Sequence, residues 1–257
     1  MSPITQTRSR WYSLGIFQGP EETLESYERR AHLLASREPS PGTEAARAIV
    51  QACYEADPLW VEVLFSDEGL QPWEAGCTWY SSDHDQLPQI QLRRALQRKK
   101  RYLWLYDRDE ILAHEYVHAM RAPLNSTLFE EFFAYFTSQY AGKSYVHYFR
   151  AFVGPVFAHP REPFILIAAV MGIVLLLVTE YSFWGAATLM IATPLFFLGR
   201  LILRWRTWYR CKRRIDEAAG QHALALMARL SDEEIVRLSH MSQAEAREWL
   251  QLNVFKF

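Results

Sequence analysis

The hydrophobic pattern divides the chain into two kinds of segment. Over most of its length, apolar residues alternate with polar ones, but residues 164–179 (FILIAAVMGIVLLLVT) and 182–203 (SFWGAATLMIATPLFFLGRLIL) are almost continuously apolar. An amphipathic helix of a soluble protein keeps a polar stripe, which neither run has. Since a membrane-spanning helix needs roughly 20 apolar residues, the pattern predicts a transmembrane helical hairpin over 161–204, with a kink at Pro194.

Charge and aromatic residues around this hairpin predict its orientation. Arg150 and Arg161 precede it, seven Lys and Arg residues follow between positions 200 and 214, and the turn has none. The positive-inside rule then places both termini in the cytoplasm. The aromatic residues expected at the two membrane interfaces are Tyr181, Phe183 and Trp184 at one, and Trp205, Trp208 and Tyr209 at the other. A buried hairpin of a soluble core and a shallow re-entrant hairpin are the alternatives.

Helical spacing gives way to strand-like spacing near residue 58. Residues 20–37 and 40–56 carry apolar positions at helical intervals, which predicts a helical N-terminal region over 1–57. Beyond it come short segments rich in β-branched and aromatic residues, bounded by Gly, Pro and Asp. They predict three or four strands, at 59–66, 76–82, 88–93 and 101–107.

Two helices are predicted after the last strand. The first carries His114, with Asp107 and Glu110 as a capping pair at its start and Pro123 at its end. The second begins near Thr127, which would form a capping box with Glu130. Beyond the hairpin, Ser-x-x-Glu boxes at 231–234 and 242–245 predict short helices. The chain is thus divided into segments 1–57, 58–160, 161–204 and a helical tail over 205–257.

Composition narrows the function classes. The 28 basic and 29 acidic residues nearly cancel, which argues against a nucleic-acid partner. The three cysteines have no short CxxC spacing, which favours free thiols in a reducing compartment. That agrees with the cytoplasmic orientation.

The segment HEYVH, residues 114–118, carries the clearest chemistry. Two histidines four apart on a helix project to one side, so His114 and His118 can reach one Zn²⁺ ion. Glu115 lies beside the metal without being a ligand, where it can activate a zinc-bound water as a general base.

A catalytic zinc site needs a third protein ligand. Glu131 is the first candidate, because it lies on a helix otherwise lined with aromatic residues, where an unused carboxylate is costly to bury. Glu130, already explained as a cap partner, and His159, reached through a loop, are the alternatives.

His114-Glu115-x-x-His118 followed by Glu131 and Ala134 on a second helix resembles the gluzincin branch of zincin metallopeptidases over residues 58–140. The resemblance implies an α+β fold, with a zincin-like small sheet, an active-site helix and a Glu helix, here followed by the transmembrane hairpin and the helical tail. It also implies an edge strand that aligns the substrate. Candidates for stabilising the reaction intermediate are Tyr145, His147 and Tyr148.

The leading hypothesis is therefore a membrane-anchored zinc metallopeptidase that hydrolyses protein or peptide substrates near the bilayer on its cytoplasmic side. A non-catalytic zincin-like membrane scaffold that binds protein partners is the alternative, and a lipid-processing metallohydrolase is a third class.

Two weaker features are a cation-binding cluster at Asp83, His84 and Asp85, and Arg121 as a surface residue that pairs with Glu131 or a substrate carboxylate.

Overall fold

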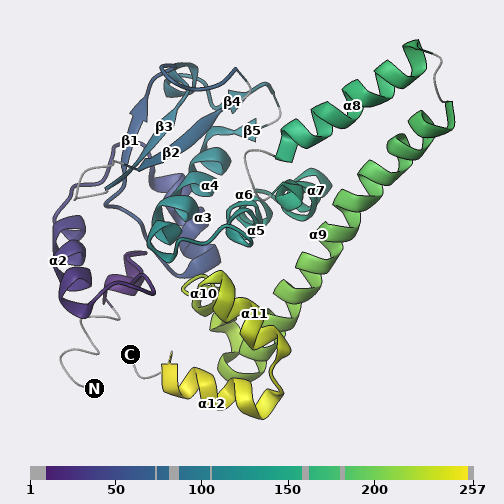
Figure 1. Cartoon of the computed structure of the whole chain (residues 1–257). Coiled ribbons are helices and arrows are strands. Elements are labelled where there is room, and N and C mark those ends of the chain that lie inside the picture. Colours follow the sequence, from purple (N-terminus) through teal and green to yellow (C-terminus); the bar gives the residue numbers. More distant parts are fainter. Residues whose placement is uncertain are drawn as a thin grey trace.

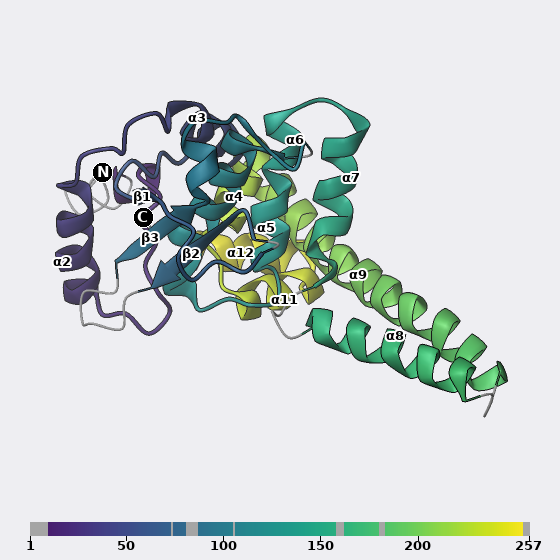
Figure 2. The same ribbon diagram turned by 90° about the horizontal axis from the view of Figure 1, so that it is seen from above.

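A computed structural model describes residues 10–72, 74–80, 87–104, 106–157, 162–179 and 183–253. It is a mixed α+β fold, mainly helical, in which a small sheet lies beside a group of helices and a helical hairpin projects from one side (Figures 1 and 2). Predicted features at 81–86, 158–161 and 180–182 lie outside the described residues. They include the Asp83–Asp85 cluster, His159, Arg161 and Tyr181.

The predicted strands form one three-stranded sheet and one short hairpin. β1 (Glu62–Phe65) pairs in parallel with β3 (Pro88–Leu92), and β2 (Gly76–Tyr80) pairs antiparallel with the other side of β3. The order β1-β3-β2 leaves β2 at an edge. The prediction of a single strand over 101–107 is wrong: β4 (Arg101–Tyr102) and β5 (Tyr106–Asp107) pair with each other. They do so because Leu103 and Trp104 adopt positive φ and reverse the chain.

Both N-terminal helices form within their predicted ranges. α2 (Leu24–Ala35) begins at Thr23, whose hydroxyl accepts a hydrogen bond from the Ser26 N–H. α3 (Glu44–Tyr54) packs against α4 (Arg108–Arg121), which follows β5 directly, as predicted. Between α3 and α4 in the sequence, residues Arg94–Gln97 form the 3₁₀ turn η1.

The helix that carries Glu131 starts differently from the prediction. α5 spans Glu130–Phe136, after η2 (Ala122–Leu124), and the structure has no Thr127–Glu130 capping box. Instead, the carboxylate of Asp232 accepts hydrogen bonds from the N–H groups of Thr127, Leu128 and Phe129, at 2.7, 2.6 and 3.2 Å. A residue more than 100 positions away in the sequence therefore replaces the local cap. α6 (Ser138–Ala141), α7 (Tyr145–Val153) and η3 (Gly154–Val156) then lead to the hairpin.

The hairpin consists of α8 (Glu162–Val178) and α9 (Phe183–Ala219), which pack against each other. Among the described helices, α9 alone is long and apolar enough to cross a membrane by length and composition, while α8 is a shorter apolar helix. α9 continues through Pro194 without ending there. Most apolar side chains of the hairpin are exposed.

The second half of α9 belongs to the core of the domain. Trp205 and Trp208 were expected at a membrane interface, but both are buried. Trp205 packs edge-on against Phe132, and Trp208 packs against Phe133 and Phe136, with ring centroids 4.7 to 6.0 Å apart. The predicted interfacial position of these two tryptophans is therefore wrong, because α5 offers them aromatic partners that the linear pattern does not show.

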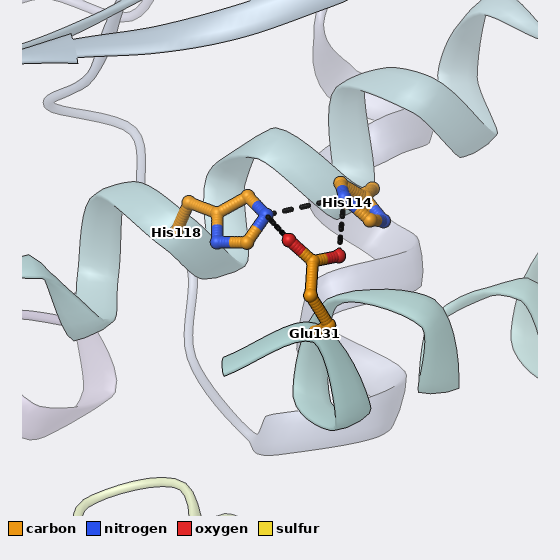
Figure 3. A group of neighbouring side chains, drawn as sticks. All are labelled: His114, His118 and Glu131. Carbon is orange, nitrogen blue, oxygen red and sulfur yellow. Dashed lines mark hydrogen bonds and ion pairs between the residues drawn. The ribbon is translucent and has the colours of Figure 1, made fainter. Parts of the chain in front are cut away.

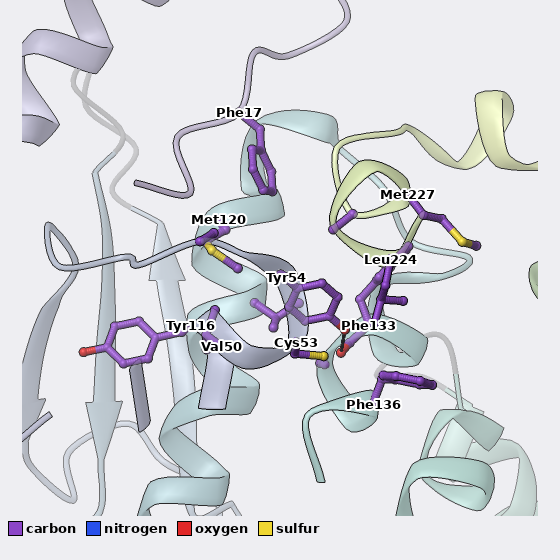
Figure 4. Close-up of a cluster of buried hydrophobic side chains, with 14 of the residues drawn as sticks. Phe17, Val50, Cys53, Tyr54, Tyr116, Met120, Phe133, Phe136, Leu224 and Met227 are labelled. Atoms are coloured by element: carbon purple, nitrogen blue, oxygen red, sulfur yellow. Dashed lines mark hydrogen bonds between the residues drawn. The ribbon is translucent and has the colours of Figure 1, made fainter. Parts of the chain in front are cut away.

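Short helices at the C-terminus complete this core. They are η4 (Gly220–His222), α10 (Ala223–Met227), α11 (Asp232–His240) and α12 (Gln243–Asn253). The predicted Ser231–Glu234 and Ser242–Glu245 boxes are both confirmed by reciprocal hydrogen bonds. Leu224 and Met227 of α10 join Tyr54 and Phe133 in one hydrophobic cluster (Figure 4), so residues from 1–57, 58–160 and 205–257 share a single core.

Candidate metal centre

α4 places the two histidines of HEYVH one turn apart on the same side. Their Nε2 atoms lie 3.1 Å from each other. The helix begins after Asp107, but the predicted capping pair is wrong. The Asp107 side chain makes no capping hydrogen bond, and Glu110 bonds Arg150 of α7 instead. Acidic residues in the first turn still suit the positive end of the helix dipole.

Glu131 of α5 faces both imidazoles (Figure 3). One carboxylate oxygen lies 3.6 Å from His114 Nε2, and the other lies 3.6 Å from His118 Nε2. The side chains of all three residues are partly exposed, so solvent reaches them. The residues expected as ligands are thus brought together, and their potential ligand atoms lie within 4.8 Å of one another.

These distances can be compared with what zinc requires. Ligands about 2.0–2.1 Å from a tetrahedral zinc ion are themselves separated by about 3.3 Å. The 3.1 Å between the two imidazole nitrogens, and the 3.6 Å from each nitrogen to its own oxygen of the Glu131 carboxylate, bracket that value. The donor set, two imidazole nitrogens and one carboxylate, is also that of a catalytic zinc site with an open fourth position. The residues present therefore fit a zinc ion.

Glu130 has a different role from the one predicted. Its Oε1 lies 3.2 Å from His118 Nδ1, and its Oε2 accepts a hydrogen bond from Arg121 Nε at 2.8 Å. Because an ionised carboxylate can only accept, Nδ1 of His118 carries a proton, so that after loss of the other proton the lone pair of Nε2 is available to a metal ion. Glu130 thus orients a ligand without facing both histidines as Glu131 does.

Arg121 connects this pair to the C-terminal helices. It was expected at the surface, but it is 1% exposed, and it pairs with Glu130 rather than Glu131. Its Nη1 donates hydrogen bonds to the carbonyls of Ala228 and Leu230, at 2.6 and 3.3 Å. The guanidinium also lies 4.0 Å from the ring centroid of Phe133. The buried guanidinium charge is therefore stabilised by the Glu130 carboxylate, two backbone carbonyls and the face of the Phe133 ring.

Glu115 is held by the edge strand. The Thr78 hydroxyl on β2 donates a hydrogen bond to Glu115 Oε2 at 2.8 Å and also lies 3.1 Å from the Glu115 carbonyl. Burial raises the pKa of Glu115, an effect that His118 and the Thr78 hydrogen bond partly oppose. A raised pKa suits a carboxylate that must both take up and release a proton. Residue spacing alone does not point to Thr78, since its position beside Glu115 depends on strand register.

Burial and neighbouring charges set the protonation of the ligands. Burial lowers the pKa of His114 well below its usual value, and the charge on His118 adds to this effect. Burial also acts to lower the pKa of His118, but Glu131, Glu130 and Glu115 outweigh it and raise the value to about 10. Burial raises the pKa of Glu131 to about 6, against the opposing effect of His118. At neutral pH the metal-free site thus holds a proton on His118 that a cation would displace.

The predicted intermediate-stabilising residues are not brought to this site by any described contact. Tyr145 is almost fully exposed, and His147 contacts Ser144 and Glu110. His147 does join Asp107 and Glu110 in a second group of potential ligands. The two carboxylates of that group already pair with Arg101 and Arg150, which makes it an ion-pair network.

Two tyrosines missed by the sequence analysis do lie at the centre. The Tyr135 ring packs edge-on against His114, with centroids 4.6 Å apart, and the Tyr80 hydroxyl donates a hydrogen bond to the His118 carbonyl at 3.2 Å. Tyr135 follows Glu131 by four residues on α5, and Tyr80 follows Thr78 by two residues on β2. Helical and strand spacing would therefore have placed each tyrosine on the correct element. Comparison of the chain with protein-family models, curated proteins and solved structures found no match.

Proposed function

We propose that this chain is a zincin-like, membrane-anchored zinc metallopeptidase with His114, His118 and Glu131 as metal ligands. The observation that carries the proposal is that two imidazole nitrogens 3.1 Å apart each lie 3.6 Å from a carboxylate oxygen of Glu131, beside the buried Glu115. Chance proximity of two histidines does not account for the additional carboxylates, one facing both imidazoles and one oriented by β2.

Glu115 is the general base of the proposed reaction. When bound, zinc supplies a Lewis acid that polarises a carbonyl and increases the acidity of a water molecule. The Thr78 hydroxyl engages Oε2 of Glu115, so proton uptake falls to the other carboxylate oxygen. Glu115 then returns that proton to the leaving amine, for which its raised pKa is suited.

The free edge of β2 is the proposed binding position for substrate. Among the strands that the structure describes, β2 pairs with β3 alone, and Thr78 on β2 touches Glu115. An extended peptide added to this edge would place its backbone along the general base. The neighbouring Trp79 and Tyr80 are exposed and available to substrate side chains.

The hairpin is the proposed anchor, with α8 and α9 both crossing the bilayer and both termini in the cytoplasm. The exposed apolar surface of both helices supports this arrangement. Arg200 lies about 26 Å along α9 from Phe183 at 1.5 Å per residue, close to the thickness of the hydrocarbon core. It pairs with Glu162 at the start of α8, which places the charged pair at the edge of the apolar region.

The proposal is tested by incubating the detergent-purified protein with a diverse peptide library and identifying new termini by mass spectrometry. Wild type should generate cleavage products that a chelator abolishes and zinc restores. Glu115→Gln should keep its zinc and lose cleavage by a factor of at least about 10². Equal cleavage by both proteins would disprove the enzymatic role, and zinc without any cleavage would favour the scaffold alternative.

A further inference from the structure

Helix α7 turns its aromatic side away from the domain. Four residues at helical spacing form one exposed stripe: Tyr145, Tyr148, Phe149 and Phe152. The opposite side carries Arg150, whose Nη1 lies 2.6 Å from Glu110 Oε2, and the buried Ala151. A surface helix of a soluble protein has the reverse arrangement, with its apolar stripe toward the core.

A second exposed apolar element lies in the β4–β5 hairpin. Leu103 and Trp104 lie between its two strands, and Trp104 is 93% exposed. Both residues have positive φ, a conformation that bulky residues rarely adopt and that Asn or Gly would accept without strain. Four exposed basic residues, at 98–101, precede the turn. Aromatic residues beside a basic cluster are typical of a membrane interface.

These two elements are continuous with the base of the hairpin. Tyr106 of β5 lies under the Arg150 guanidinium of α7, 4.2 Å from its ring centroid. At the other end of α7, the Phe152 ring stacks on Trp205 of α9 at 5.8 Å, and Trp205 Nε1 donates a hydrogen bond to the Phe152 carbonyl. Figure 1 shows β4, β5 and α7 on the side of the domain from which α8 departs.

We propose that the Leu103–Trp104 turn and the aromatic stripe of α7 form one interfacial surface that lies in the headgroup region of the bilayer. Amphipathic aromatic side chains favour that depth, and the 98–101 cluster matches the charge of anionic lipids. The inference rests on the proposed membrane position of the hairpin and is independent of peptidase activity. Such contact would hold the domain at a fixed height, so that the proposed metal centre meets polypeptide segments emerging close to the bilayer.

Site-specific fluorescence in nanodiscs tests this surface on the full chain. Cys77→Ser removes the part-exposed thiol, and Cys53 and Cys211 are buried. Single cysteines for an environment-sensitive dye are then introduced as Trp104→Cys and Phe149→Cys. Leu252→Cys, at an exposed position on α12, is the matched control, and Leu175→Cys on α8 reports on the hairpin. The lipids are phosphatidylcholine with or without phosphatidylserine, each carrying a small fraction of doxyl-labelled lipid.

We expect quenching at 104 and 149 to exceed that at 252 several-fold, and quenching at 104 to increase with phosphatidylserine. Quenching at 175 together with control-level signals at 104 and 149 would refute the interfacial surface while leaving the hairpin in the bilayer. Control-level signals at all positions would refute both. A response at 104 and 149 that requires two chains in one nanodisc would assign the surface to a second copy and contradict the lipid proposal.

Discussion

At the scale of single residues, two adjacent glutamates carry out different tasks because neighbouring positions on a helix point about 100° apart. Glu131 faces both imidazoles, whereas Glu130 bonds His118 Nδ1 and Arg121. The carboxylate of Glu130 orients His118, a proposed metal ligand, in an arrangement that commonly tunes metal affinity.

Replacing Glu130 should weaken zinc binding without abolishing it. Glu130→Gln keeps the shape of the side chain but removes the charge that holds His118 and Arg121, so zinc affinity should fall by roughly 10- to 100-fold. Competition with a chromogenic chelator measures this change. An affinity equal to that of wild type would mean that Glu130 does not orient His118. Glu74→Gln, a substitution on the loop before β2, is the control for a lost acidic residue near the site.

Zinc binding should release protons. Because the pKa of His118 is raised to about 10 in the metal-free protein, the ligand is protonated at neutral pH and must lose a proton to bind a cation. The apparent affinity for zinc should therefore rise with increasing pH at pH values below the pKa of His118. Titration calorimetry in buffers of different ionisation enthalpy gives the number of protons released, and a value of zero at pH 7 would contradict the described charge distribution.

At the scale of elements, the start of α5, which carries Glu131, is held by Asp232, a residue far away in the sequence. Asp232, on the first turn of α11, accepts three backbone hydrogen bonds from the segment before α5. Arg121 at the end of α4 bonds the carbonyls of Ala228 and Leu230, just before α11. Both ligand-bearing helices are thus tied to the C-terminal segment.

Removing the Asp232 carboxylate should destabilise the protein. Asp232→Ala leaves three N–H groups without their acceptor, and a loss of about 1–3 kcal/mol is expected for such groups. Glu233→Ala, at the exposed neighbouring position in the same helix turn, should change stability by less than about 0.5 kcal/mol. Denaturant unfolding in detergent compares the two variants, and equal stability would show that the bonds to Asp232 contribute nothing.

At the scale of the whole molecule, the two halves of α9 differ in what surrounds their apolar side chains. Its first half exposes apolar side chains, while its second half buries Trp205, Trp208, Cys211 and Ile215 in the core of the domain. One continuous helix therefore joins the exposed apolar segment, the proposed anchor, to the domain, and no flexible linker separates them in the described part of the chain.

Two tryptophans on this helix should respond differently to substitution. Trp208 is fully buried against Phe133 and Phe136, so Trp208→Ala should cost about 3–5 kcal/mol. Trp184 is exposed near the start of the same helix, and Trp184→Ala should leave the unfolding of the detergent-solubilised domain nearly unchanged. Similar destabilisation by both would argue against the division of α9 into an exposed half and a core half.

Local sequence patterns predicted where helices and strands form better than they predicted which residues contact one another. The strands β1, β2 and β3, the α4 helix and both Ser-x-x-Glu boxes follow from residue spacing, whereas the β4–β5 hairpin replaces the single strand predicted over 101–107. The choice of Glu131 as a ligand rests on the cost of burying an unused carboxylate among phenylalanines, and its carboxylate does lie beside both histidines. Thr78, Arg121 and Asp232 were missed or misread because their roles depend on strand register or on contacts more than 100 positions apart. Trp205 and Trp208 were misplaced because their aromatic partners lie on α5, far from them in the sequence.

The most direct test of the central claim is the metal content of the purified protein. Wild type prepared without chelators should contain about one zinc per chain, and Glu131→Ala should lose most of it while circular dichroism shows the same helical content. A wild-type protein that binds no zinc when the metal is supplied, or a Glu131→Ala variant that keeps it, would contradict the proposed His114–His118–Glu131 centre.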